Sequence, residues 1–187
     1  MRQRFTLGRV GRYDITAAPS AVGGLLLLWL AFGFIGRKVF RLRPPAALIG
    51  GLLAAVLHFM SELWHQAGHA RAAEHTGYPM EGVHLWGVLG TSLYPPDEPS
   101  LPAEVHVRRA LGGPQASAGL AVATLLLMPL ARRLGGIPFM LTALMALENL
   151  AVFTLGAFLP LPFMETDGSV LQRYRNEHRR RMVIISE

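Results

Sequence analysis

Two histidines four residues apart, His65 and His69, are the residues of this chain whose types and spacing most clearly suggest chemistry. On an α-helix, residues at i and i+4 lie on one face, so both imidazoles can reach the same metal ion. A catalytic zinc ion takes three protein ligands and leaves a fourth position for water. Because the chain has no cysteine, the third ligand must be another His, an Asp or a Glu.

The residue after the first histidine decides what such a site can do. In the His-Glu-x-x-His motif of zinc metalloproteases, this residue is a glutamate that acts as the general base. Here it is Gln66, whose neutral amide is a very poor proton acceptor. Loss of a positioned base removes about 10²- to 10⁴-fold in rate. We therefore expect metal binding to survive and any proteolytic step to be impaired.

An aspartate near the C-terminus is the candidate third ligand. Asp167 lies in "METDG", shortly after two prolines that must end the preceding helix. In the membrane topology that the sequence predicts, it emerges on the same side as His65 and His69. An Asp before a Gly is also common in simple turns, and that interpretation is the alternative.

Two other carboxylates are candidates to replace the missing base. Glu62 lies one helical turn before Gln66 on the same face, and Glu165 lies two residues before Asp167. Their alternative roles are to orient a histidine ligand and to remain a solvated loop charge, respectively. We expect neither carboxylate to be well placed as a base.

The elements that hold these residues are predicted to cross a membrane. Of the 187 residues, 51% are hydrophobic and 16% are charged, and three uncharged runs are 18 to 22 residues long. About 20 apolar residues suffice for a transmembrane helix. The first run is too long and too far from the start to be a signal peptide. We predict one domain over 1–187, an all-α membrane protein with short surface strands and spans at 17–35, 46–64, 114–131 and 137–159.

Ionisable and amide side chains inside these spans are costly unless they are buried in the bundle. His58 lies too deep to join the metal site, so we expect it to hydrogen-bond within the bundle. Glu148 and Asn149 lie in the middle of the fourth span and should face the interior rather than lipid.

The distribution of the 18 Lys and Arg residues predicts the orientation. Most of them lie in segments on one side of the four spans, which predicts that both termini are cytoplasmic. The cluster Arg37, Lys38, Arg41 and Arg43 falls on the opposite side. We expect a prokaryotic cell membrane as the location, lipid contacts for the basic tail 170–187, and no nucleic-acid partner. The oligomeric state is left open.

Short strands are predicted outside the spans. Residues 1–16 alternate apolar and polar side chains, and the loop 76–109 contains the strand-like run "VHLWGVL". A protease holds its substrate extended, and main-chain pairing with an edge strand achieves this with little sequence preference. We therefore predict substrate contacts at Leu85, Trp86, Gly87 and Val88.

Four motifs, in order along the chain, together resemble the site-2 protease family of intramembrane zinc metalloproteases. They are "FTLGRVGRYDITAAPSAVGGLLLL", the helix with His65 and His69, "GGPQAS", and "LPLPFMETDG". The resemblance implies a zinc site of two histidines and Asp167, and a transmembrane protein as substrate. The chain departs from the family at Gln66, at Ser117 where Asn is frequent, and before the late prolines.

Two functions stay open at this point. One is an intramembrane zinc endopeptidase that cleaves a transmembrane substrate, weakened by Gln66. The other is a catalytically inactive homologue that binds and regulates a membrane partner and keeps zinc as a structural ion. A haem carrier is disfavoured, because the predicted spans other than the second contain no histidine to serve as a facing axial ligand.

Overall fold

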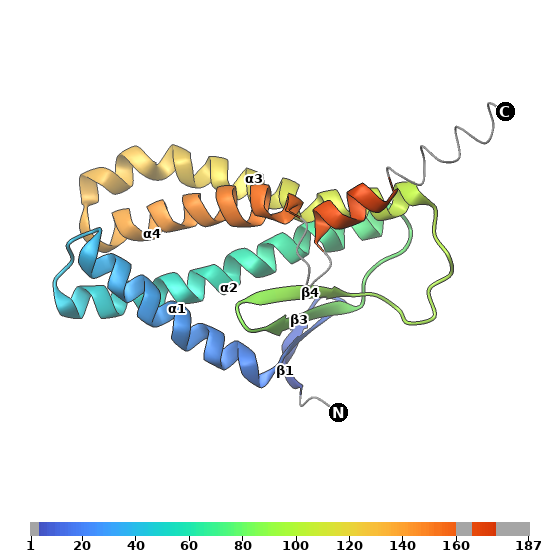
Figure 1. The fold of residues 1–187 in the computed structure, drawn as a ribbon, viewed down its shortest axis with the longest axis horizontal. Coiled ribbons are helices and arrows are strands. Elements are labelled where there is room, and N and C mark those ends of the chain that lie inside the picture. Colours follow the sequence, from blue (N-terminus) through green and yellow to red (C-terminus); the bar gives the residue numbers. More distant parts are fainter. Residues whose placement is uncertain (1–3, 160–165, 175–187) are drawn as a thin grey trace.

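The structure is a computed structural model, and it describes residues 4–159 and 166–174. Four long helices pack side by side, with a small sheet beside one end of the bundle (Figure 1). The last helix continues into a π-helical segment and a short 3-10 turn. The helical elements are α1 (Pro19–Lys38), α2 (Pro44–His75), α3 (Ala103–Leu134), α4 (Gly136–Leu147), η1 (Glu148–Leu155) and η2 (Gly156–Phe158).

All four helices, with α4 counted together with η1 and η2, are long and apolar enough to cross a membrane. Their outward faces carry large apolar side chains, such as Leu27 on α1 and Leu126 on α3, which are 64% and 76% exposed. The buried faces are rich in Ala and Gly instead, as is usual where helices approach closely in a membrane. The predicted fold class is confirmed, and the chain is an integral membrane protein.

Helices α2 and α3 extend well beyond the apolar segments. α2 begins at the Pro44-Pro45 pair, where proline is tolerated in a first turn. α3 begins at Ala103, earlier than the predicted span, because the helix continues through Gly112-Gly113-Pro114. Packing against α2 compensates for the backbone hydrogen bond that Pro114 cannot make. Both extensions bring polar residues of the two helices together.

The sheet has the strand order β1-β2-β3-β4, with β2 and β3 parallel and the other pairs antiparallel. Gly87, at φ 54°, forms the turn between β3 and β4, so "VHLWGVL" divides into an inner strand, a turn and the start of an edge strand. The strands are β1 (Phe5–Val10), β2 (Tyr13–Ala17), β3 (Gly82–Trp86) and β4 (Leu89–Leu93).

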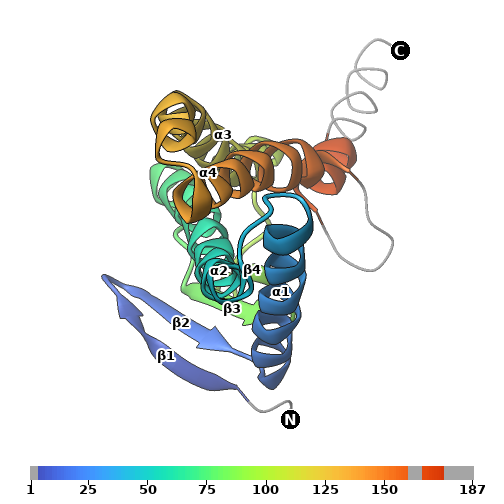
Figure 2. The same ribbon diagram turned by 90° about the vertical axis from the view of Figure 1, so that its left-hand side faces the viewer.

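The sheet lies alongside α2 and the beginning of α1 (Figure 2). The Tyr13 hydroxyl donates a hydrogen bond to Glu74 near the end of α2. Burial, together with this bond, raises the pKa of Tyr13 to about 12. Inner residues of β3, such as Val83, pack with Met80 and Ala70 in an apolar cluster that joins sheet and helix.

The helix connections at the end of the bundle away from the sheet are basic (Figure 1). Arg37, Lys38, Arg41 and Arg43 flank the first connection, and Arg132 and Arg133 flank the second. The ring of Phe40 meets that of Phe139 at 5.6 Å, which places the two connections side by side. The cytoplasmic location of the termini stays a prediction.

The crossing of α2 and α3 depends on two glycines. A Cβ atom added to Gly68 would overlap the Gly112 carbonyl, and one added to Gly112 would overlap the Gly68 carbonyl. We expect Gly68→Ala to lower the midpoint of thermal unfolding in detergent, since overpacking costs about 1–3 kcal/mol. Gly119→Ala on α3 is the matched control, because a Cβ there meets nothing within 4 Å. Equal midpoints for the two variants would contradict the close crossing.

Candidate metal centre

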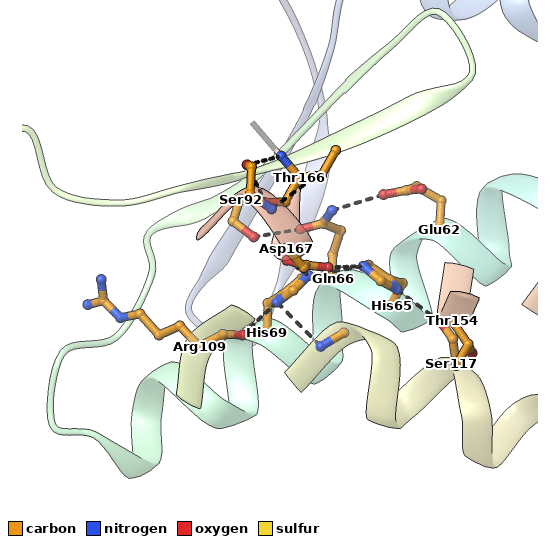
Figure 3. Close-up of polar contacts among 12 residues, drawn as sticks. Glu62, His65, Gln66, His69, Ser92, Arg109, Ser117, Thr154, Thr166 and Asp167 are labelled. Carbon is orange, nitrogen blue, oxygen red and sulfur yellow. Dashed lines mark hydrogen bonds and ion pairs between the residues drawn. The ribbon is translucent and has the colours of Figure 1, made fainter. Parts of the chain in front are cut away.

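His65, His69 and Asp167 converge on one point (Figure 3). Each offers one ligand atom, and these three atoms lie within 4.8 Å of one another. The two Nε2 atoms are 3.0 Å apart. The Asp167 carboxylate oxygens lie 3.5 Å from Nε2 of His65 and 3.6 Å from Nε2 of His69. The histidines are buried and the aspartate is nearly so.

A short helix over 167–174 holds Asp167 in place. Thr166 caps its start: the Thr166 hydroxyl accepts the Ser169 N–H at 3.2 Å, and the Ser169 hydroxyl accepts the Thr166 N–H at 2.9 Å. This reciprocal pair is a capping box with Ser in the second position. A Cβ on Gly168 would overlap the backbone of Phe158. The Asp-Gly pair is therefore a helix start pressed against the end of η2, not a free surface turn.

Helix α3 fixes the orientation of both histidine rings. Nδ1 of His69 lies 2.8 Å from the Arg109 carbonyl oxygen, which can only accept, so this nitrogen carries the proton. The longer contact of 3.3 Å from the Gly113 N–H to the same nitrogen does not change that assignment. Nδ1 of His65 lies 3.0 Å from the Ser117 hydroxyl. When His65 likewise donates its Nδ1 proton, to the Ser117 hydroxyl, the Nε2 lone pairs of both histidines face each other.

This geometry fits a metal ion. In this tautomer the two lone pairs, 3.0 Å apart, repel each other unless a cation lies between them. A tetrahedral zinc ion with bonds of ~2.0–2.2 Å separates its ligand atoms by about 3.3–3.6 Å, close to the observed distances. A Cβ on Gly113 would overlap Nε2 of both histidines, so glycine leaves the space that an ion and a water need. Two imidazoles and one carboxylate are a donor set that zinc accepts.

Gln66 lies beside this centre, and both polar atoms of its amide are engaged in hydrogen bonds. Its amide N–H donates to Glu62 at 2.9 Å, and its amide oxygen accepts from the Ser92 hydroxyl at 2.7 Å. The reverse amide orientation would place two oxygens against each other, because an ionised Glu62 can only accept. The Gln66 amide is therefore engaged by a carboxylate on one side and by a hydroxyl on the other.

Glu62 is buried, 3% exposed, and lines the same cavity as the metal ligands. Its contacts show a carboxylate engaged by the Gln66 amide and lying against Gly90 of β4. The other candidate base, Glu165, lies outside the described residues. That neither carboxylate acts as a base stays a prediction.

A cavity of about 700 Å³ lies over the metal centre. Its walls come from α2, α3, β4, η1 and the helix 167–174. β4 contributes Leu89, Gly90, Thr91 and Ser92 to the lining, whereas Leu85, Trp86, Gly87 and Val88 do not line it. The structure differs here from the predicted substrate contacts, because β3 is paired on both sides, and among the described residues the unpaired strand edge beside the cavity belongs to β4.

Arg109 closes the end of this cavity that lies outside the apolar part of the bundle. Its buried guanidinium bonds Glu98 at 2.5 and 3.0 Å and the Tyr78 carbonyl at 2.5 Å. It also lies 4.2 Å from the centroid of the Tyr94 ring, and burial raises the pKa of Tyr94. The side chain of Arg109 thus fixes the loop after β4, while its carbonyl orients His69.

Sequence reasoning missed several of these roles. Ser117 was noted only as a departure from a family motif, although its place in "GGPQAS" indicated a position near the site. Arg109 and Ser92 had no local signal, because their contacts with α2 join residues 40 and 26 positions apart in the chain.

No protein-family model matches the sequence, and no curated protein matches it. Among solved structures, the chain is similar to the Site-2 Protease from Methanocaldococcus jannaschii, with a TM-score of 0.60 and 18% sequence identity. The similarity covers 91% of this chain and 70% of that protein. The helices, the strands and their order thus have the fold of a site-2 protease.

The space that Gly113 leaves can be tested through metal binding. We expect Gly113→Ala to reduce zinc binding to the purified protein at least ~10-fold, since its Cβ occupies the position between the two Nε2 atoms. Isothermal titration after chelator treatment measures this. Gly119→Ala, on the same helix with open space around it, should bind zinc like the parent. Unchanged affinity in Gly113→Ala would show that the ion, if bound, lies elsewhere.

Proposed function

We propose that the chain is an intramembrane zinc metalloprotease-like protein that captures an extended segment of a transmembrane polypeptide and cleaves it slowly. The observation that carries the proposal is the convergence of His65, His69 and Asp167 beside the β4 edge of the sheet, in one cavity of a membrane domain. The fold of a site-2 protease supports it.

Two elements of the chain, β4 and η1, would hold the substrate segment. The outer edge of β4 pairs with no other strand in the part of the chain that the structure describes, and an unwound helix can add to it as a further strand. η1 forms the opposite wall with Ala151, Val152 and Phe153. These apolar side chains suit a substrate that comes from the bilayer. A zinc ion held by the three ligands would polarise a substrate carbonyl and ease the deprotonation of a water.

Proton transfer is the weak step. The Gln66 amide cannot accept a proton, and both of its polar atoms already have partners in Glu62 and Ser92. The same observation favours the second candidate function, a catalytically inactive homologue that binds and regulates a transmembrane partner.

Restoring a carboxylate distinguishes these two functions. We expect Gln66→Glu to raise cleavage of a helical transmembrane reporter by about 10²-fold or more, because a positioned general base contributes that much. Glu62→Gln should change the parent's slow cleavage little. Reporter cleavage is measured in proteoliposomes, with Gln66→Glu/Asp167→Asn as the control that should lose the gain. Robust cleavage by the parent that Glu62→Gln abolishes would instead identify Glu62 as the base.

The role of β4 can be tested with a photo-crosslinking amino acid. We expect a probe at Thr91, which is exposed at the cavity, to capture a transmembrane reporter peptide in proteoliposomes. The matched control is a probe at Leu7, which is also exposed but lies on β1, the other edge of the sheet. Equal capture at both edges would contradict selective binding along β4.

A further inference from the structure

His58 joins two separate elements deep in the bundle, two helical turns before His65 on α2. It is 5% exposed. Its Nε2 lies 2.8 Å from the Val88 carbonyl oxygen, and its Nδ1 lies 3.2 Å from a carboxylate oxygen of Glu148. The expectation that His58 hydrogen-bonds within the bundle is confirmed. Its two partners lie on different elements, Glu148 on η1 and Val88 in the turn between β3 and β4.

The two partners do not line the cavity themselves, but each adjoins or begins an element that does. Val88 lies in the turn that leads directly into β4, and Glu148 is the first residue of η1. The cavity is lined by Gly90 and Thr91 on the strand side and by Val152 and Phe153 on the η1 side. His58 therefore connects the starting points of the two segments between which a polypeptide would lie.

The protons in this contact follow from its chemistry. The Val88 carbonyl can only accept, so Nε2 of His58 carries a proton. The contact between Nδ1 and Glu148 then holds one shared proton, on the histidine or on the carboxyl group. In either case the pair has no net charge, which makes it tolerable inside a membrane. Removal of either His58 or Glu148 would leave the polar or charged group of the other buried without its hydrogen-bond partner.

The segments that carry the two partners of His58 pack closely against their neighbours. A Cβ on Gly24 of α1 would overlap the Gly87 carbonyl, so the β3–β4 turn is pressed between α1 and α2. On the other side, the Phe153 ring lies 5.5 Å from the His58 ring and 5.8 Å from that of His65. Next to Glu148, the Asn149 amide donates to the Ser61 hydroxyl at 3.0 Å.

We propose that His58 is a positioning residue whose two hydrogen bonds set the separation between β4 and η1, and thus the width of the cavity. The π-helical form of η1 agrees with this role, because such segments occur frequently at functional sites. The identity of the occupant, an extended polypeptide, rests on the proposed function. The separation between β4 and η1 can be tested independently of that function.

The separation can be measured with spin labels, and the absence of native cysteine makes the labelling specific. Labels at Thr91→Cys and Val152→Cys report the distance between the two walls in detergent or nanodiscs. His58→Phe should lengthen and broaden this distance distribution. Glu148→Gln should preserve it, because its amide can donate to Nδ1 while Nε2 still donates to Val88. A second label pair at Leu27→Cys and Leu126→Cys, both exposed on the bundle, should be unchanged in every variant.

The double variant His58→Phe/Glu148→Met separates positioning from simple charge compensation, and it carries the test if His58→Phe does not fold. It contains no unpaired carboxylate, yet the Val88 carbonyl still lacks its donor. An altered distance in the double variant supports the proposal. A distance equal to the parent's, in the double variant or in His58→Phe itself, overturns it.

Peptide binding adds a readout that tests the occupant. A fluorescent transmembrane reporter peptide should bind the double variant about tenfold more weakly than Glu148→Gln, the loss expected for one displaced hydrogen-bonding contact. Altered wall spacing with no reporter binding by any variant, the parent included, would leave the positioning role of His58 in place and contradict the proposed function.

Discussion

The contact between the backbones of α2 and α3 is the constraint on which the site depends. Gly68 and Gly112 allow these helices to meet without intervening side chains. Only at this separation can Ser117 and the Arg109 carbonyl, both on α3, reach the histidines on α2. Gly113 then leaves room for an ion between the two rings. A larger residue at any of these positions would separate the helices or fill the metal position.

Several polar side chains inside the bundle form hydrogen-bonded sets. His58 with Glu148, Gln66 with Glu62 and Ser92, and Asn149 with Ser61 each join elements that are distant in sequence or consecutive turns of one helix. An unpaired polar group in an apolar surrounding is costly, so these pairs specify which surfaces meet. The apolar contacts with lipid do not specify this, since lipid tails accept any apolar face equally well.

A glutamine, rather than a carboxylate, lies beside the three candidate metal ligands. Gln66 keeps a hydrogen bond on each side and so joins α2 to β4 through Ser92. A carboxylate at this position could not donate to an ionised Glu62, and the two negative charges would repel each other. The neutral amide therefore joins these neighbours without adding a second charge to the buried site.

The sequence by itself determined the features that depend on local pattern: four apolar helices, strands near residues 1–16 and within 76–109, and a histidine pair on one helical face. It also suggested Asp167, through a proline-broken helix before an Asp-Gly pair. Only the tertiary structure decided that α3 continues through Pro114, that β4 is the strand edge at the cavity, and that Gln66 lies between Glu62 and Ser92. The reason is physical. Periodicity and helix breakers act within a few residues, whereas the partner of a buried polar group is chosen by contacts between segments that the chain brings together only when it folds.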